Sequence, residues 1–440
     1  MRKKATHEIS DLNAFKARLV CWGAQHETAL FLDGHNERYR QEPSEHDRTS
    51  FEALLAVGVK ESVVLQGKSA FDDLEAFRQD HKDWMFGHLG YDLKNADEDL
   101  VSHNPDGVGF ADGYFFVPHK VFLVYSDRLE VHYCHKSWSE WPDDLVAIES
   151  TIMPTHSEAS AILLQPRISK DTYLETLNNI KYHIEIGDIY ETNYCQEFYA
   201  EDTPLNPLVT FLSLNQYSRA PFSAFYRLGK KYALCASPER YLRKKGDNLL
   251  SEPIKGTAKR LPDPQADIKH RLQFINDEKE RRENIMVTDL VRNDLSKVAA
   301  KGSVAVTALC ACRTYAHVHQ LVSSVACTLK TDTTVVQALR ATFPMGSMTG
   351  VPKVMACALM EQFEAHKRGL YSGTIGYITP DADFDFNVVI RTLLYAADMN
   401  YVSLSVGGAI TSASDPEKEY LECLIKADAL MSVLKGSHTA

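Results

Sequence analysis

The chain has 440 residues, of which 44% are hydrophobic and 24% are charged. This composition is typical of a soluble globular protein and excludes disordered and collagen-like classes. The net charge of −11 disfavours binding to nucleic acid or to an anionic membrane, so an anionic substrate would need a local cationic site.

The nine cysteines are scattered and include no Cys-x-x-Cys pair, which is typical of reduced thiols and predicts a cytoplasmic protein. Apolar runs stay well below the roughly 18 residues that a membrane-spanning helix needs. The basic start Met1-Arg2-Lys3-Lys4 is followed by polar residues rather than by the apolar segment of a signal peptide. We therefore expect no targeting or membrane segment.

Residues 1–150 are predicted to be mixed α/β, with β-rich runs at 62–65 and 115–125. This part shows no catalytic constellation. Residues 151–166 have little periodicity and form the best candidate linker. We therefore divide the chain into an N-terminal region, 1–165, and a catalytic region, 166–437.

A regular pattern begins at Ser169, which is predicted to cap a helix that Gly187 ends. A strand over 189–198 follows, and its alternation places Glu191 and Asn193 on one face. Polar residues on one strand face are either solvated or directed into a site. Taken alone, the pattern favours solvation.

The run Ser237-Pro238-Glu239-Arg240 follows a short apolar strand. Because Pro238 fixes the local backbone, the Glu239 carboxyl is held in a defined direction. A carboxylic acid that stays protonated in an apolar site can donate its proton to a leaving hydroxyl. The alternative is an exposed pair formed by Glu239 and Arg240.

The run Pro253-Ile254-Lys255-Gly256-Thr257 places one lysine at a tight turn, with Lys259 and Arg260 close behind. Desolvation and neighbouring cations favour the free amine of a lysine, which is a nucleophile. Lys255 is therefore a candidate catalytic residue. In isolation, the same pattern is more often a surface lysine in a loop.

Two helices carry paired carboxylates near their N-termini. Asp277 and Glu280 form a capping box for a helix over 278–290, and Asp415 caps a C-terminal helix. The pairs are Glu280 with Glu283 and Glu419 with Glu422. They could face solvent or complement the helix dipoles, or they could converge on Mg²⁺, which takes a few carboxylates.

The glycine-rich run 343–353 opens a helix but lacks the spacing of a phosphate loop. Strands are predicted over 371–378, 384–395 and 402–410. Arg391 suits recognition of a carboxylate, and Gly407-Gly408 would let a ligand approach the backbone closely. Each also has a structural explanation, such as an ion pair within the strand or a β-bulge.

Together these motifs resemble the chorismate-utilising enzymes over roughly residues 169–436. The residues that carry the resemblance are Ser237-Pro238-Glu239-Arg240, Pro253-Ile254-Lys255-Gly256-Thr257, Glu283-Asn284 to Asp289, Arg292-Asn293-Asp294, Met348-Thr349-Gly350-x-Pro352-Lys353, Gly376-Tyr377, Ile390-Arg391-Thr392 and Glu419-Tyr420-x-Glu422. The resemblance implies an α/β (α+β) sandwich of two large antiparallel sheets packed face to face, with flanking helices.

Within that family, Lys255 makes the chain resemble the aminodeoxychorismate synthase branch, because anthranilate synthases have alanine at this position. The resemblance implies that chorismate and ammonia give 4-amino-4-deoxychorismate, for p-aminobenzoate and folate biosynthesis. Lys255 would attack C2 of the ring while Glu239 protonates the departing C4 hydroxyl. Anthranilate synthase component I and a non-catalytic chorismate-binding subunit are the alternative functions.

The resemblance also implies the remaining parts of the site. Glu283 and Glu422 would be the principal Mg²⁺ ligands, with Glu280 and Glu419 behind them. The substrate contacts would be Gly256, Thr257, Thr349, Tyr377, Arg391, Gly407, Gly408 and Lys426. The chain shows no glutaminase motif, so a separate glutamine amidotransferase subunit or free ammonia is the expected nitrogen source.

Three positions depart from the family pattern. Gln320 stands where most members have histidine, and whether His317 or His319 replaces that imidazole is open. Glu191 stands where aminating members usually have glutamine and water-using members have lysine, which leaves the handling of ammonia open. The tryptophan-binding Leu-Leu-Glu-Ser element is replaced by 31–34, Phe-Leu-Asp-Gly, so feedback inhibition by tryptophan is not expected.

Overall fold

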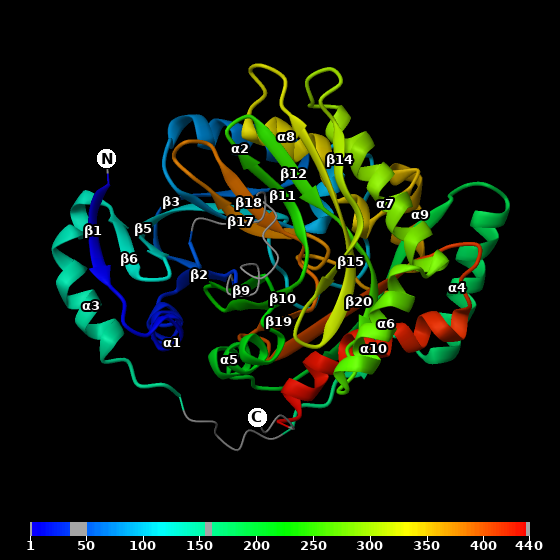
Figure 1. Cartoon of the computed structure of the whole chain (residues 1–440). Coiled ribbons are helices and arrows are strands. Elements are labelled where there is room, and N and C mark those ends of the chain that lie inside the picture. Colours follow the sequence, from blue (N-terminus) through cyan, green and yellow to red (C-terminus); the bar gives the residue numbers. More distant parts are fainter. Residues whose placement is uncertain (1, 36–50, 155–160, 437–440) are drawn as a thin grey trace.

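The computed structural model describes residues 2–35, 51–154 and 161–436 (Figure 1). The strands are β1 Lys3–Glu8, β2 Thr28–Asp33, β3 Ala53–Leu65, β4 Met85–Leu89, β5 Gly113–Val124, β6 Arg128–Tyr133, β7 Gln165–Pro166, β8 Glu191–Ala200, β9 Phe222–Leu228, β10 Lys231–Ser237, β11 Arg240–Lys245, β12 Asn248–Glu252, β13 Ile254–Lys259, β14 Ala305–Thr314, β15 Val318–Thr328, β16 Gly350–Val351, β17 Thr374–Ile378, β18 Phe384–Asn387, β19 Thr392–Ala396 and β20 Tyr401–Ile410. The helices are α1 Leu12–Gly23, α2 Ala70–Asp80, α3 Trp141–Glu149, α4 Lys170–Glu185, α5 Pro207–Ser218, α6 Pro264–Ile275, α7 Glu278–Ser296, α8 Val335–Thr342, α9 Lys353–Phe363 and α10 Pro416–Leu434.

The strands form two antiparallel leaves that are continuous at β5. The first leaf has the order β3-β2-β9-β10-β19-β20-β8, and the second has the order β4-β17-β18-β11-β12-β15. Strand β5 pairs with β3 and with β4 and thereby joins the two leaves. The predicted sandwich of antiparallel sheets with flanking helices is confirmed.

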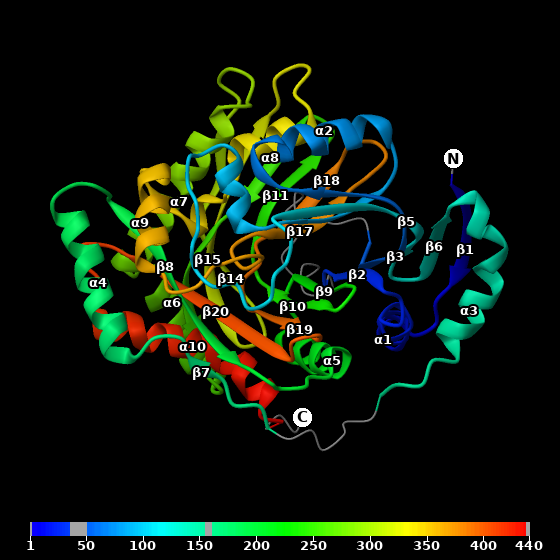
Figure 2. The ribbon, with the colours of Figure 1, turned by 180° about the vertical axis from the view of Figure 1, so that it is seen from behind.

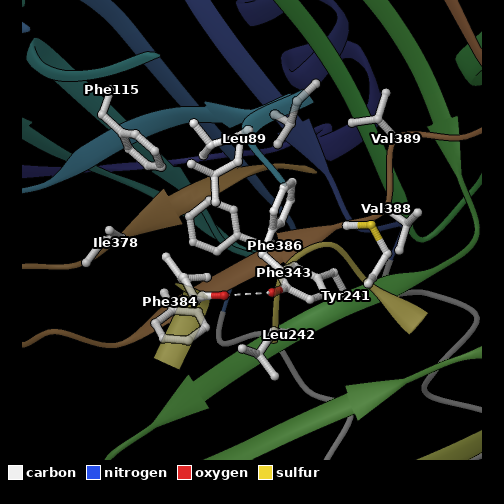
Figure 3. Packing of buried hydrophobic residues seen from close by; sticks show 14 of the residues in the cluster. Leu89, Phe115, Tyr241, Leu242, Phe343, Ile378, Phe384, Phe386, Val388 and Val389 are labelled. Carbon is white, nitrogen blue, oxygen red and sulfur yellow. Dashed lines mark hydrogen bonds between the residues drawn. The ribbon is translucent and has the colours of Figure 1, made fainter. Parts of the chain in front are cut away.

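An inner core fills the space between the leaves. Strand β2 shows how it forms, because Leu30 packs into this core while Ala29 and Phe31 face the outer cluster. In the part shown in Figure 3, Phe115 and Phe386 meet at 6.1 Å between ring centroids. Strand alternation therefore buries one face of each leaf against the other leaf and leaves the opposite face for helices.

Helices pack against both leaves (Figures 1 and 2). The outer cluster contains apolar residues of α1, α4, α5 and α10, which pack on the first leaf. Helix α7 instead contributes Val287, Val291 and Leu295 to the inner core and lies against β13, β14 and β15. None of the helices in the described parts of the chain has the length and hydropathy needed to cross a bilayer.

The predicted helix boundaries are largely confirmed. Ser169 caps α4 by accepting a hydrogen bond from the backbone N–H of Thr172 at 3.1 Å, and Gly187 follows the helix with φ +87°. Asp415 caps α10 in the same way. Helix α7 runs to Ser296, beyond the predicted end at residue 290, because its apolar face continues into the inner core.

The single strand predicted over 384–395 is wrong. Residues 384–387 form β18, which pairs with β11 and β17 in the second leaf, and 392–396 form β19, which pairs with β10 and β20 in the first leaf. The chain crosses between leaves at 388–391, where Arg391 has φ +52°. The residues stay strand-like in type through this crossing, with three apolar residues in a row at 388–390, so one continuous strand was predicted. The division at residue 165 stays a prediction.

Candidate active site

One cavity of about 370 Å³ brings most of the predicted site residues together. Its walls come from β8, β13, β15, β20, α7, α10 and the segment 346–349. The predicted residues that line it are Glu239, Lys255, Gly256, Thr257, Glu280, Glu283, Arg391, Gly407, Glu422 and Lys426. Motifs that are far apart in the sequence thus meet at one place.

Glu239 lies between β10 and β11 and is only 3% exposed. Its backbone N–H donates to Ser237 Oγ at 3.2 Å, and its carbonyl accepts from Val388 N at 3.0 Å. Burial raises the pKa of the Glu239 carboxyl to about 7, although a hydrogen bond with Ser347 and the charge of Lys255 oppose the shift. Glu239 can therefore hold a proton near neutral pH.

The alternative of an exposed pair of Glu239 and Arg240 is wrong. The Arg240 guanidinium is buried and binds Asp385, with Nε 3.0 Å from Oδ1, and it also pairs with Glu252. A positive charge is thereby fixed on a strand next to the acid but directed to other partners. Arg240 orders the backbone that presents Glu239.

Lys255 lies at the start of β13, half-buried, directly before Gly256, which has φ +90°. The expectation that cations surround it is wrong for Arg260, which binds Asp267 at 3.1 Å, although Lys259 lines the cavity. The carboxyls that sense the charge of Lys255 are Glu191, Glu239, Glu283 and Glu422. The lysine therefore lies in a largely acidic setting.

The two predicted carboxylate pairs converge at one side of the cavity. Asp277 caps α7, but the Glu280 side chain does not accept a hydrogen bond from the backbone N–H of Asp277, so the predicted capping box is only half formed. Glu280 instead lies beside Gly256, with its Oε2 2.9 Å from the position that a Cβ on Gly256 would take. Burial, Glu283 and Glu422 raise the pKa of Glu280 to about 7. Glu419 is buried at 3% exposure and the Glu283 side chain is 14% exposed, whereas the Glu422 side chain is 45% exposed, so the two pairs are only partly removed from solvent.

Two lysines share this acidic cluster. Lys279 Nζ lies 3.4 Å from Glu419 Oε1 and 3.8 Å from Glu283 Oε1. Lys426 Nζ lies 2.6 Å from Glu422 Oε1 and also donates to the carbonyl of Gly407 at 2.9 Å. The carboxylates are therefore partly neutralised by protein ammonium groups.

The donor chemistry of the cluster fits a hard cation. Glu283 Oε1 is buried without a hydrogen-bond partner, and carboxylate oxygens are the ligands that Mg²⁺ prefers. Within residues 2–35, 51–154 and 161–436, however, no three His, Cys, Asp or Glu side chains already stand in an arrangement that could hold a metal ion. Because Lys279 and Lys426 lie against the carboxylates, metal binding would require these salt bridges to rearrange.

Cationic groups at the α10 side suit an anionic substrate. Arg391 Nη1 donates to the carbonyl of Lys426 at 3.2 Å, which orients the arginine next to that lysine. A Cβ on Gly408 would lie 3.7 Å from Glu419 Oε2 and 3.8 Å from Lys426 Nζ, so Gly408 sits close beside both groups. This part of the cavity can bind carboxylates.

Three predicted substrate contacts do not line this cavity, namely Tyr377, Thr349 and Gly408. Tyr377 lines a separate cavity of about 60 Å³ and packs against Phe51 at 5.7 Å, so the structure does not bring it together with the other predicted substrate contacts. Thr349 Oγ1 donates to the carbonyl oxygens of Met345 and Gly346, both at 3.3 Å. Thr349 therefore holds the shape of its loop rather than lining the cavity.

Several lining residues were missed, among them Asn193, Ser347 and Tyr371. Glu191 and Asn193 are 3% and 5% exposed, so the expectation that they face solvent is wrong. Their common face on the strand was the available signal. Tyr371 was placed in the predicted strand over 371–378, but that strand begins only at Thr374, and Tyr371 lies in the turn before it.

Of the three side chains considered near position 320, those of Gln320 and His317 reach the cavity and that of His319 does not. Gln320 lines it, and its Oε1 is buried without a hydrogen-bond partner. His319 points away and binds Asp267 Oδ1 at 3.0 Å. His317 also lines the cavity, where its ring stacks on Tyr217 at 4.5 Å.

A family model described as chorismate binding enzyme matches residues 27–432. The chain is 36% identical over 366 residues to an aminodeoxychorismate synthase of Streptomyces griseus, with 80% of this chain and 50% of that protein covered. It is 34% identical over 358 residues to aminodeoxychorismate synthase component 1 of Escherichia coli, with 79% and 76% covered. The chain thus spans half the length of the first relative and about three quarters of the second.

Solved structures show the same fold at lower identity. Anthranilate synthase component I from Streptococcus pneumoniae superposes with a TM-score of 0.77 at 23% identity, covering 89% of this chain and 96% of that one. The menaquinone-specific isochorismate synthase of Escherichia coli superposes with a TM-score of 0.76 at 17% identity, covering 99% and 95%. At these identities the likeness shows the fold alone.

Proposed function

Because the chain belongs to the chorismate-binding enzyme family, we propose that it aminates chorismate at C4, as aminodeoxychorismate synthase component I. The observation that carries this proposal is the presence of Lys255 and the buried acid Glu239 in one cavity. A nucleophilic amine and a protonated acid are what displacement of a ring hydroxyl requires.

In the proposed reaction, the free amine of Lys255 forms a bond to C2 of chorismate. The ring double bond shifts, the C4–O bond breaks, and Glu239 gives its proton to the departing hydroxyl, which leaves as water. Ammonia then forms a bond to C4, and the C2–N bond breaks to return the amine of Lys255. Burial of Glu239 supports this role because it keeps the acid protonated near pH 7.

Magnesium is part of the proposal. Glu283 and Glu422 would be its principal ligands, with Glu280 and Glu419 behind them. Lys279 would have to give up its salt bridges to Glu283 and Glu419. When bound, Mg²⁺ would supply positive charge for a carboxylate of the substrate. Arg391 and Lys426 would bind a substrate carboxylate from the chain itself.

The partner of the reaction would be a glutamine amidotransferase subunit that supplies ammonia. The product would serve p-aminobenzoate and folate biosynthesis. All nine cysteines are free, which suits the reducing cytoplasm, and we place the enzyme there.

Two other functions remain as alternatives. Anthranilate synthase component I shares the fold, but Lys255 stands where that branch has alanine. A non-catalytic chorismate-binding subunit would have no need of a buried acid with a raised pKa, yet Glu239 has one.

The proposed function can be tested by incubating the protein with chorismate, Mg²⁺ and ammonium and identifying the product by mass and NMR. We expect an amine at C4 with the enolpyruvyl group retained. Lys255→Ala should abolish this product and the covalent adduct in the intact mass of the protein, while its unfolding temperature stays near that of the exposed control Lys301→Ala. Anthranilate, or a fully active Lys255→Ala protein, would refute the proposal.

A further inference from the structure

A buried histidine lies directly behind the wall of the cavity and has no role in the proposed reaction. His366 is 3% exposed, and its Nε2 lies 3.1 Å from Oγ of Ser405 on β20. Ser405 lines the catalytic cavity, whereas His366 does not. The serine side chain therefore connects the buried ring to the space that a substrate would occupy.

Strand alternation explains why a serine reaches the cavity at this point. Alternate residues of 402–406 pack into the outer cluster, so Ser403 and Ser405 face the opposite side of the first leaf. Ser403 Oγ donates to Glu197 Oε1 at 2.6 Å and does not line the cavity. The two serines thus share a strand face and are similarly buried, but only Ser405 meets the cavity.

The imidazole ring has one nitrogen to spare. Within the described residues, His366 Nδ1 is buried without a hydrogen-bond partner, and Ser405 Oγ has no partner besides the ring. Burial lowers the pKa of His366, so the ring is neutral at pH 7 and carries a single N–H group. The nitrogen that holds this proton decides whether the serine hydroxyl donates to the ring or into the cavity.

An anionic substrate would select one of the two tautomers. Both tautomers leave Nδ1 as it is, so they differ only at the serine. With the proton on Nδ1, Ser405 donates to His366 Nε2 and presents only lone pairs to the cavity. With the proton on Nε2, the ring donates to Ser405 Oγ, and the serine O–H can donate to a carboxylate in a charge-assisted hydrogen bond. A bound carboxylate therefore favours the second arrangement.

We propose that Ser405 binds a carboxylate of the substrate through its O–H group, and that His366 positions this hydroxyl by donating from Nε2 to Ser405 Oγ. This inference rests on the proposed function for its substrate, chorismate, which carries two carboxylates. The next residue on the same face of β20 is Gly407, whose carbonyl accepts from Lys426 at 2.9 Å. Ser405 thus adjoins the part of the cavity that suits carboxylates.

The test is the dissociation constant of chorismate, measured by calorimetry with Mg²⁺ in the Lys255→Ala background, where no covalent adduct can form. Ser405→Ala should weaken binding by about tenfold to a hundredfold, as expected for a hydrogen bond to a charged group. His366→Leu should weaken it by about threefold to tenfold, because the hydroxyl remains but is no longer positioned. His366→Gln, whose amide N–H can still donate to Ser405, should restore most of the affinity.

Ser403→Ala is the matched control. It removes a buried hydroxyl from the same strand face, and its partner Glu197 lies outside the cavity, so it should lower stability and leave the affinity unchanged. An equal loss of affinity in Ser403→Ala and Ser405→Ala would overturn the substrate contact, as would unchanged binding in Ser405→Ala. A His366→Gln protein that binds no better than His366→Leu would overturn the positioning role.

The protonation of the ring gives a second readout, which needs no change at Ser405. In ¹⁵N NMR spectra, the His366 resonances are identified by their loss in His366→Gln, and with chorismate bound they should show a protonated Nε2 and a bare Nδ1. A proton on Nδ1 in the complex would overturn the proposal. A protein that binds chorismate but forms no aminated product would refute the proposed function alone, and one that does not bind chorismate would refute both.

Discussion

At the scale of single residues, the environment of Glu239 determines its chemistry. Pro238 before it and its place between β10 and β11 hold the carboxyl in position, and burial raises its pKa to about 7, so that much of it is protonated at neutral pH. A glutamate in water would be ionised at neutral pH and could not act as an acid. The same burial makes the folded protein sensitive to pH.

Glu239→Gln should remove that sensitivity together with activity. Because the pKa of Glu239 is about 7 in the folded protein and 4.5 otherwise, the folded state holds a proton that the unfolded chain has released, and stability falls as pH rises through this window. The variant should therefore be more stable than the wild type at pH 8, by up to about 3 kcal/mol, and equally stable at pH 4. Thermal unfolding across pH measures this difference.

The rate of product formation should fall by roughly 10²- to 10⁴-fold in the same variant, since a general acid contributes about that much. Glu61→Gln, at an exposed position of β3, is the control. A stability difference that is the same at pH 4 and pH 8 would contradict the burial argument.

The sequence was informative about residues whose chemistry depends on type and order. Lys255, Glu239 and the four paired glutamates converge as the motifs predicted. That Tyr377 lines another cavity could not be predicted, because a motif fixes position in the chain but not the direction of a side chain. The acidic surroundings of Lys255 also could not be predicted, since Glu191 and Glu422 come from distant segments.

At the scale of elements, a buried arginine ties together the segments that bound the cavity. Arg368 Nη2 donates to the carbonyl of Asn193 at 2.7 Å, and Nη1 donates to the carbonyl of Met348 at 2.7 Å. Glu364, at the end of α9, pairs with Arg368 at 2.6 Å and accepts from Cys195 N at 3.0 Å. This network joins β8, α9 and the loop before β16.

Arg368→Met should destabilise the protein by about 3–5 kcal/mol, because it leaves Glu364 buried without its cation and two carbonyl groups without donors. Arg340→Met is the matched control. Arg340 pairs with Asp72 and Asp97 at the surface, so its loss should change stability by no more than about 1 kcal/mol. Urea unfolding of the two variants compares them, and equal losses would contradict the role of burial.

Elements with strong local signals were predictable. The caps at Ser169 and Asp415 located α4 and α10, and the periodicity after Ser169 supported α4. The crossing at 388–391 was not predictable, because a strand pattern does not reveal which sheet its residues join. Tertiary pairing, rather than local propensity, separates β18 from β19.

At the scale of the whole molecule, metal binding and stability should be coupled. The acidic cluster joins α7, which packs on the second leaf, to α10, which packs on the first. A cation that binds there would link helices from both leaves. It would also favour the folded state, in which alone the carboxylates are gathered.

Mg²⁺ should therefore raise the free energy of unfolding by about 2.7 kcal/mol at 100 times its dissociation constant, and a chelator should reverse the effect. Glu283→Gln should abolish this response. Glu278→Gln, which alters an exposed carboxylate on the same helix, should retain it. Thermal unfolding with and without Mg²⁺ measures both, and a full response in Glu283→Gln would contradict the assigned ligand.

The pairing of β4 with β17 constrains the order in which the sheet can form during synthesis of the chain. One edge of β4 pairs with β5, which is made soon afterwards, but the other edge finds its ladder partner only in residues 374–378, near the other end of the chain. At a synthesis rate of about 5–20 residues per second, β4 waits roughly 15–60 s on the ribosome with an unpaired edge. An unpaired edge is a template for aggregation, so chaperones that shield nascent strands should matter more to the yield of this protein than its final stability does.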